Sequence, residues 1–253
     1  MRQLVRNPLW LAGFAIQFII GMPLNMLAQT YIGPAIIPGL MAVGLIVLAI
    51  GAVCLARESL RLLDSVGILL VMGAIALFGL SGLGVDMKAI DLDDTAFLIR
   101  LAVFTVLVAS LSVTCHVLQG RTTRLRGVLR TLDAGLLFVQ SNLWLGVLMG
   151  SLARWRAGRF ANWDLLPAVA ASCITFTGSM LGIAETQRAF QVGDAAKLVP
   201  MQSVPQQILP LFSYFAVFGL TPPSRAALPL AVTAAALILT GSALLSRRQA
   251  SLS

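Results

Sequence analysis

Residues 95–118 read TAFLIRLAVFTVLVASLSVTCHVL, a run of 24 residues in which only Arg100 carries a full charge at neutral pH. A helix needs about 20 mostly apolar residues to cross the hydrocarbon core of a bilayer. The run is long enough and apolar enough to meet that requirement. It therefore predicts a membrane-spanning helix.

Seven further apolar runs of similar character flank this one, which predicts an all-α polytopic bundle of about eight transmembrane helices. The eight runs cover residues 8–29, 32–56, 64–84, 95–118, 130–151, 165–188, 195–220 and 226–246. The first run is longer than the apolar core of a signal peptide and lacks a small-x-small cleavage site. We therefore treat residues 1–253 as a single integral membrane domain.

The composition agrees with a membrane protein, because 58% of the residues are hydrophobic and 11% are charged. Soluble domains carry about 25% charged residues, so a soluble globule, a disordered chain and a disulfide scaffold are excluded. The net charge of +8 does not indicate nucleic-acid binding, because the basic residues lie in small groups between apolar runs. The three cysteines, Cys54, Cys115 and Cys173, form no loop pair that suggests a disulfide or a metal site.

The basic residues also predict the orientation, since Lys and Arg are retained on the cytoplasmic side. With the N-terminus inside, the inner segments hold Arg2, Arg6, Arg57, Arg61, Arg121, Arg124, Arg126, Arg130, Arg188, Lys197, Arg247 and Arg248. The outer segments hold Lys88, Arg100, Arg154, Arg156, Arg159 and Arg225. We expect a multi-pass protein of the bacterial plasma membrane with both termini in the cytoplasm. The outer cluster at 154–159 breaks the bias, either because it binds lipid head groups, which we favour, or because one span is misplaced.

Two junctions between apolar runs resemble each other. The first reads AQTYIGPAIIP at 28–38 and the second reads QRAFQVGDAAKLVP at 187–200. Each contains a Gln, an aromatic residue, a Gly at the turn, and a Pro early in the next helix. Because the two junctions fall on opposite sides, they suggest an inverted-topology repeat, as in many transporters. Two ordinary tight turns would explain the same residues.

Several motifs resemble the drug/metabolite transporter superfamily, in particular bacterial proteins similar to NIPA-type magnesium transporters. They are RNPLWLAG at 6–13, Leu27-Ala28 followed by Gly33, Pro34 and Pro38, RESL at 57–60 with Gly67 after it, QRAFQ at 187–191, and Leu198-Val-Pro200. The resemblance covers residues 6–246. It implies two inverted half-repeats, 1–119 and 127–248, around a central substrate cavity, with Gly33, Pro34, Pro38, Gly193 and Pro200 at the helix breaks.

The chain also departs from this family, whose members usually have nine or ten helices. A leading helix before residue 8 would be missing, so we expect either an upstream start or the loss of a helix. In the second case a homodimer or a partner protein would supply the missing helix.

Polar residues inside the apolar runs are candidates for a substrate path, because such groups need partners where there is no water. The candidates are Asn25, Gln29, Gln140, Asn142, Glu185, Gln187, Gln202 and Gln206, with Gln17, Ser141, Thr175, Thr177, Ser203 and Gln207 nearby in the sequence. Hydrogen bonds that join helices would explain any one of them equally well.

Ionisable groups in the runs are few. Glu185 could bind a proton or a cation, although Arg188 offers it an ion pair. Asp133 lies beside Arg130 at an expected helix start, and His116 is expected near the inner interface. Mg²⁺ usually takes one or two carboxylate ligands, so a cavity lined by amides suits an organic metabolite or a lipophilic cation at least as well, and the organic solute ranks narrowly first.

The sequence therefore favours a secondary transporter that moves a small organic solute by alternating access. Two alternatives remain: a magnesium or divalent-cation transporter, and a membrane subunit that transports nothing. No motif of an enzyme is present, so we expect no catalytic residues, no cofactor and no resident metal. The expected partners are the lipid bilayer and the substrate.

Overall fold

The protein is described here from a computed structural model, which covers residues 8, 12, 15–44, 47, 62–92, 94–122, 125–158, 165–192 and 195–250. Its elements are η2 (Gln17–Gly21), α2 (Met22–Ile32), α3 (Ile37–Leu40), α5 (Leu62–Ser81), α6 (Thr95–Arg121), α7 (Arg126–Arg156), α8 (Leu165–Phe190), α9 (Ala195–Ala216) and α10 (Ala227–Ala250). These ranges contain helices and no strand, so the predicted all-α class is confirmed.

Four helices within the described ranges are long and apolar enough to cross a membrane: α6, α7, α8 and the Ala227–Leu244 part of α10. The apolar part of α5, Ser65–Ser81, is shorter. Helix α9 is more polar because it carries three Gln and three Pro. The character of a membrane protein is thus clear. Residues 45–46 and 48–56 of the second predicted run lie outside the described residues.

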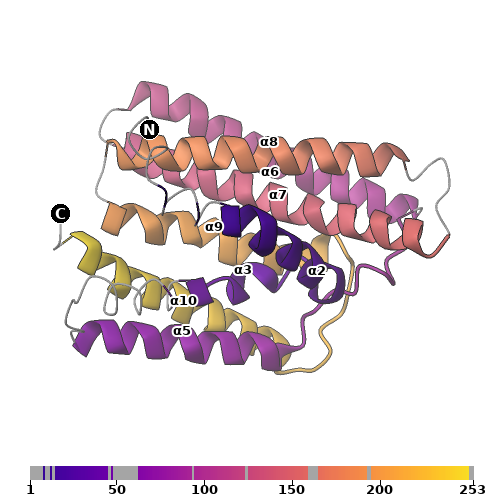
Figure 1. Ribbon diagram of the computed structural model, residues 1–253, viewed down its shortest axis with the longest axis horizontal. Helices are drawn as coiled ribbons and strands as arrows, with labels where there is room; N and C mark the ends of the chain where they lie inside the picture. The colour runs from indigo at the N-terminus through magenta and orange to yellow at the C-terminus, as the bar shows by residue number, and fades with distance from the viewer. Residues whose placement is uncertain are drawn as a thin grey trace.

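The long helices form two groups that α9 connects (Figure 1). Helices α5 and α10 pack against each other, while α7 packs against both α6 and α8. Helix α9 contacts α7 in one group and α10 in the other. Helices α5, α7 and α9 run in one direction and α6, α8 and α10 run in the other, so successive long helices alternate (Figure 1).

Helix α7 is the centre of the larger group. Its apolar window is 67% buried, against 22% for those of α6 and α8. Small residues let α8 approach it closely, as is common where helices pack in lipid. A Cβ atom at Gly178 would lie 3.1 Å from the Leu137 carbonyl oxygen, and one at Gly182 would lie 3.0 Å from the Phe138 ring. The Ser141 hydroxyl lies 2.7 Å from that of Ser179 and joins the two helices.

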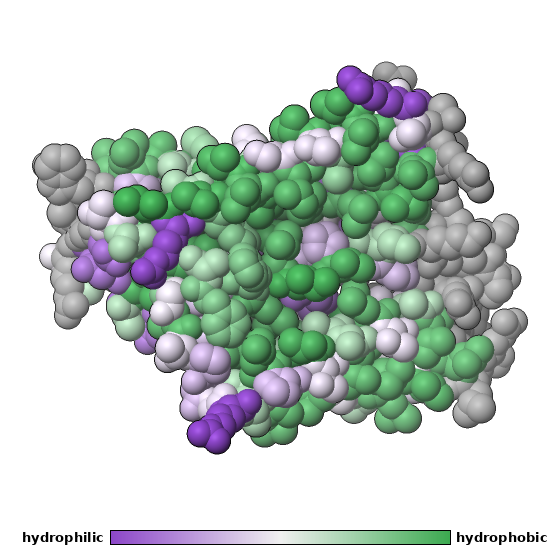
Figure 2. Space-filling model, turned by 180° about the vertical axis from the view of Figure 1, so that it is seen from behind, coloured by the Kyte–Doolittle hydropathy of each residue, from purple (hydrophilic) through white to green (hydrophobic). Residues whose placement is uncertain are grey.

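The outer faces of α6 and α8 are apolar. Large exposed side chains there include Val106, Val113, Leu166 and Phe176. Figure 2 shows one face of the molecule as mostly hydrophobic, with hydrophilic side chains gathered toward its ends. Exposed apolar surface of this extent is typical of a face that contacts a membrane or another protein.

The N-terminal helix breaks inside the protein. Gly33 ends α2 with φ at 72°, a conformation that favours glycine, and a Cβ there would lie 2.5 Å from the Val85 carbonyl oxygen. The Val85 amide donates a hydrogen bond to the Ile32 carbonyl oxygen at 2.9 Å. Residues 33–39 are all buried, unlike an ordinary exposed turn. Backbone that is not helical is tolerated at membrane depth only where protein or a cavity surrounds it.

Candidate functional site

Three amide side chains, of which Gln29 and Gln207 are buried and Asn142 is half-buried, lie around this helix break. Gln29 on α2 is fully buried, and its Nε2 donates a hydrogen bond to Asn142 Oδ1 on α7 at 3.2 Å. Gly146, one turn further along α7, leaves room for Pro34, because a Cβ there would lie 3.0 Å from the Pro34 ring. The absence of a side chain at Gly146 therefore allows the broken segment to reach the middle of the bundle.

The C-terminal end of the broken segment, at Pro38, contacts α9. Gln207 is 5% exposed, and its Nε2 donates to the Pro38 carbonyl oxygen at 3.4 Å. We call Gln29, Asn142 and Gln207 the amide cluster. Asn142 and Gln207 lie near the middles of α7 and α9. The Oε1 atoms of Gln29 and Gln207 are buried and have no hydrogen-bond partner among the described residues. Each such atom costs about 1–3 kcal/mol, so a ligand that donates hydrogen bonds would be stabilised here.

The other predicted path residues lie elsewhere. Gln140 is buried on α7 and shares a helix face with Trp144, whose Nε1 donates to Thr105 on α6 at 3.0 Å. Gln202 donates to the Thr186 hydroxyl on α8 at 3.0 Å and so joins two helices. Asn25 and Gln206 are half-buried, and Gln187 is exposed near the end of α8. The structure thus brings Gln29 and Asn142 together and does not bring Gln140, Gln187 or Gln202 to them.

Of the two residues predicted at the second helix break, only Pro200 lies within the described part of the chain. Pro200 lies inside α9, as do Pro205 and Pro210. Gly193 lies outside the described residues. Pro205 packs against Gly135 of α7, where a Cβ would lie 2.6 Å from the Gln202 carbonyl oxygen. Each proline leaves the carbonyl four residues earlier without its helical partner, so α9 has backbone acceptors that the helix itself does not satisfy.

A second polar centre lies toward the end where α6 and α8 finish and α7 begins. Glu185 on α8 is 4% exposed, and its Oε1 is 2.7 Å from Arg188 Nη1. Its Oε2 is 3.9 Å from Nε of Arg130 on α7. Arg130 Nη1 donates to the Arg188 carbonyl oxygen at 3.2 Å, which ties α7 to the last turn of α8.

Asp133 joins this centre from α7. It is 2% exposed and accepts a hydrogen bond from the Ser112 hydroxyl on α6. Its Oδ2 is 3.5 Å from Nδ1 of His116, a side chain that is 62% exposed. Gln119 Nε2 lies 2.7 Å from His116 Nδ1, and Gln119 Oε1 accepts a hydrogen bond from Arg130 Nε at 3.1 Å. We call Asp133, Glu185, Arg130, Arg188 and His116 the charge cluster.

Sequence reasoning missed this assembly. It placed Asp133 at a helix start, whereas α7 begins at Arg126 and Asp133 lies two turns inside. It treated His116 as an interfacial residue, and did not consider Ser112 or Gln119 as partners of the acidic groups. The spacing of Ser112, His116 and Gln119 at four and three residues is the one signal that could have grouped them on a helix face.

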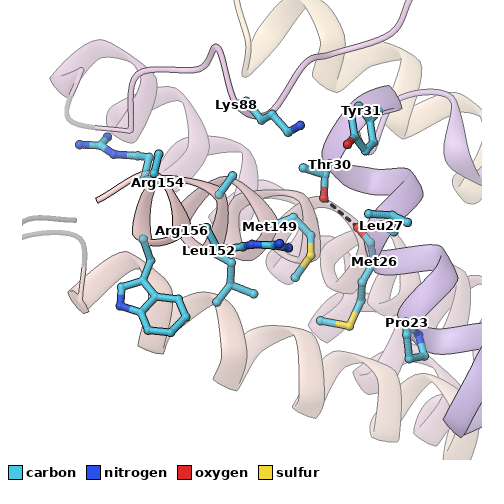
Figure 3. A pocket seen from close by; sticks show the side chains of 13 residues that line it. Pro23, Met26, Leu27, Thr30, Tyr31, Lys88, Met149, Leu152, Arg154 and Arg156 are labelled. Atoms are coloured by element: carbon cyan, nitrogen blue, oxygen red, sulfur yellow. Dashed lines mark hydrogen bonds between the residues drawn. The ribbon is translucent and has the colours of Figure 1, made fainter. Parts of the chain in front are cut away.

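A cavity of about 730 Å³ lies between α2 and the last turns of α7 (Figure 3). Met26 and Thr30, which flank Gln29 on α2, line it together with Met149, three residues after Gly146. The Thr30 hydroxyl is bonded to the Met26 carbonyl oxygen at 3.1 Å. Gln29, Asn142 and Gln207 are not among its described lining residues.

Comparison with known proteins gives no relative: no family model, no curated protein and no solved structure matches the chain.

Proposed function

We propose that this protein is a secondary transporter that moves a small organic solute across the membrane by alternating access. The observation that carries the proposal is the helix break at residues 33–36, buried in the bundle and faced by the Gln29–Asn142 pair. Discontinuous helices near the bilayer midplane form the substrate sites of many transporters, because their backbone ends can bind cargo.

The chemistry of the amide cluster favours a neutral or cationic organic solute that donates hydrogen bonds. Its unpartnered atoms are the amide oxygens of Gln29 and Gln207, which accept hydrogen bonds but carry no full charge. The buried carboxylates of Asp133 and Glu185 lie in the charge cluster, where Asp133 faces His116 and Glu185 faces Arg188. Since Mg²⁺ usually takes carboxylate ligands, the amide cluster suits it less well.

The charge cluster is the proposed coupling site. Ionisable groups inside membrane helices are costly and commonly serve proton or ion pathways. His116, which is largely exposed, contacts buried Asp133, and Arg130 reaches the buried Glu185. In this arrangement a proton taken up at His116 would change the charge balance among α6, α7 and α8, whose packing fixes the position of Asn142.

The finer assignments belong to the same proposal. They are membership of the drug/metabolite transporter superfamily, two inverted halves, about eight spans, and a plasma-membrane location with both termini in the cytoplasm. The alternation of α5 to α10 agrees with the expected order of inner and outer segments (Figure 1). The motifs at 28–38 and 187–200 support the two inverted halves through their similar sequences. Their surroundings differ, because residues 33–38 of the first motif are buried and residues 191–192 of the second are exposed.

The test measures thermal unfolding of the purified protein against Mg²⁺, other divalent ions, amino acids, polyamines and lipophilic cations. A ligand that binds only the folded state raises the unfolding midpoint. We expect an organic solute to do so, and the double variant Gln29→Leu/Asn142→Leu to abolish the shift. That variant removes both partners of one hydrogen bond, which is close to neutral for stability. Gln191→Leu, at an exposed glutamine, is the control and should keep the shift.

Uptake of the stabilising solute into vesicles that contain the protein then distinguishes transport from binding. A midpoint raised only by Mg²⁺ and lost in Glu185→Gln would replace the proposal with the divalent-cation function. A solute that binds but never enters the vesicles would favour a membrane subunit without transport activity.

A further inference from the structure

We propose that the cavity between α2 and the end of α7 binds the headgroup of an anionic phospholipid. This inference does not depend on transport. It rests on three features of the cavity: its positive charge, its expected depth in the bilayer, and its apolar wall.

The charge of the cavity is positive. Lys88, Arg154 and Arg156 line it, and its lining residues include no carboxylate. Figure 3 shows the charged ends of Lys88 and Arg156 facing the space between α2 and α7. Lys88 Nζ lies 3.9 Å from the centre of the Tyr31 ring, which holds it at the edge of the cavity. The Arg154 side chain is mostly buried, and its Nη1 lies 3.7 Å from Oδ1 of Asp91, a residue that is not among those lining the cavity. Two cationic groups thus converge on one site for an anion.

Aromatic residues place the cavity at the boundary between headgroups and hydrocarbon. The Tyr31 and Trp155 side chains are 60% and 64% exposed and both line it. Tyr and Trp are enriched at this level of membrane proteins. Arg154, Trp155 and Arg156 occupy the last turn of α7, which ends here. A phosphate at this height lies at its ordinary depth in the bilayer.

An apolar wall extends from the charged end. Leu27 on α2 and Leu152 on α7 are exposed and line the cavity, with Pro23 one turn further along α2. A soluble anion would leave this wall in contact with water, whereas an acyl chain would cover it. The combination favours a lipid over a free phosphate. It also accounts for Arg154 and Arg156, which break the charge bias between the two sides of the membrane.

A second cavity differs from the first, because no charged side chain is among its described lining residues. It has a volume of about 640 Å³ between α6 and the start of α8, and residues such as Leu98, Trp144 and Leu166 line it without any charged side chain. Acyl chains of any lipid suit that cavity, so selectivity for anionic lipid is expected only at the first.

The test compares unfolding midpoints of the full chain in detergent supplemented with phosphatidylglycerol, phosphatidylcholine or glycerol 3-phosphate. We expect phosphatidylglycerol to raise the midpoint by several degrees and the other two to have little effect. The variant Lys88→Ala/Arg156→Ala should lose most of this shift. Arg225→Ala removes an exposed arginine outside the cavity and should keep it.

Arg156→Gln keeps the Cβ–Cγ–Cδ stem and a polar end but removes the charge, and it serves if the double variant does not fold; it should lower the affinity for phosphatidylglycerol severalfold. Equal shifts with phosphatidylcholine would overturn the proposal, as would a full shift with glycerol 3-phosphate, which would indicate a soluble anion. A shift that persists in Arg156→Gln and in the double variant would place the lipid elsewhere.

Discussion

The buried carboxylate of Glu185 has one ion-pair partner nearby in the sequence and another far from it. The sequence pairs it with Arg188 on the same helix, and that pair exists at 2.7 Å. The structure adds Arg130 from α7. The buried carboxylate therefore faces one cation on its own helix and one on a neighbouring helix, while Arg188 is 57% exposed at its side chain.

At the scale of the residue we predict that removing Glu185 lowers the free energy of unfolding more than removing Arg188 does. Glu185→Ala removes the buried carboxylate that Arg188 and Arg130 face and should lower the free energy of unfolding by about 1.5–3 kcal/mol, the range for a hydrogen bond to a charged group. Arg188→Ala removes an exposed cation and should cost less than about 1 kcal/mol, because Arg130 remains near the carboxylate. Denaturant unfolding in mild detergent measures both. Similar losses for the two variants would show that the Arg130 contact contributes little.

Helices α7 and α8 illustrate how elements associate without a hydrophobic driving force between them. Their contact relies on residues that have little or no side chain, Gly178, Ser179 and Gly182, opposite Phe138 and Ser141. Close approach brings many atoms into van der Waals contact, which is the main source of helix association in lipid.

At the scale of the element we predict that Gly182→Val forces the helices apart and lowers the free energy of unfolding by about 1–3 kcal/mol. The control is Gly73→Val on α5, since a Cβ there has no atom within 4 Å and the position is exposed. Thermal unfolding in detergent should show a clear drop for the first variant and little change for the second. If Gly73→Val were equally damaging, helix propensity rather than packing would be the cause.

The whole molecule presents two ends, because its long helices alternate in direction (Figure 1). The last turn of α8 and the first turn of α7 meet at one end, while the end of α7 and the segment between α9 and α10 lie at the other. Arg121, Arg126 and Arg188 belong to the first end, and Lys88, Arg156 and Arg225 belong to the second.

For the whole molecule we predict that a thiol reagent unable to cross membranes distinguishes the two ends. Single cysteines replace Thr122 or Gln191 at the first end and Gly158 or Arg225 at the second, in a chain whose own cysteines are changed to Ala. In intact cells only the second pair should react, as expected if the first end is cytoplasmic. Reaction of Thr122→Cys with Gly158→Cys inert would reverse the orientation, and reaction of all four would contradict two-sided topology.

Much of the fold could be predicted from local composition. The runs at 95–118, 130–151, 165–188 and 226–246 correspond to α6, α7, α8 and α10, with ends that differ by a few residues. The site was harder to predict. Gln29 and Asn142 were among the candidates, but Gln140 and Gln202 were ranked with them, because a glutamine in an apolar run looks the same whether it faces a ligand or another helix.

The sequence alone determined that the chain is helical and belongs in a membrane, since a long apolar run satisfies its backbone hydrogen bonds only as a helix in lipid. Only the tertiary structure decided which polar groups meet. The contacts Gln29–Asn142, Gln207–Pro38 and His116–Asp133 join residues on different helices. Such contacts depend on how helices rotate and approach one another, and glycines such as Gly146 and Gly178 set that geometry through close packing rather than through any local pattern.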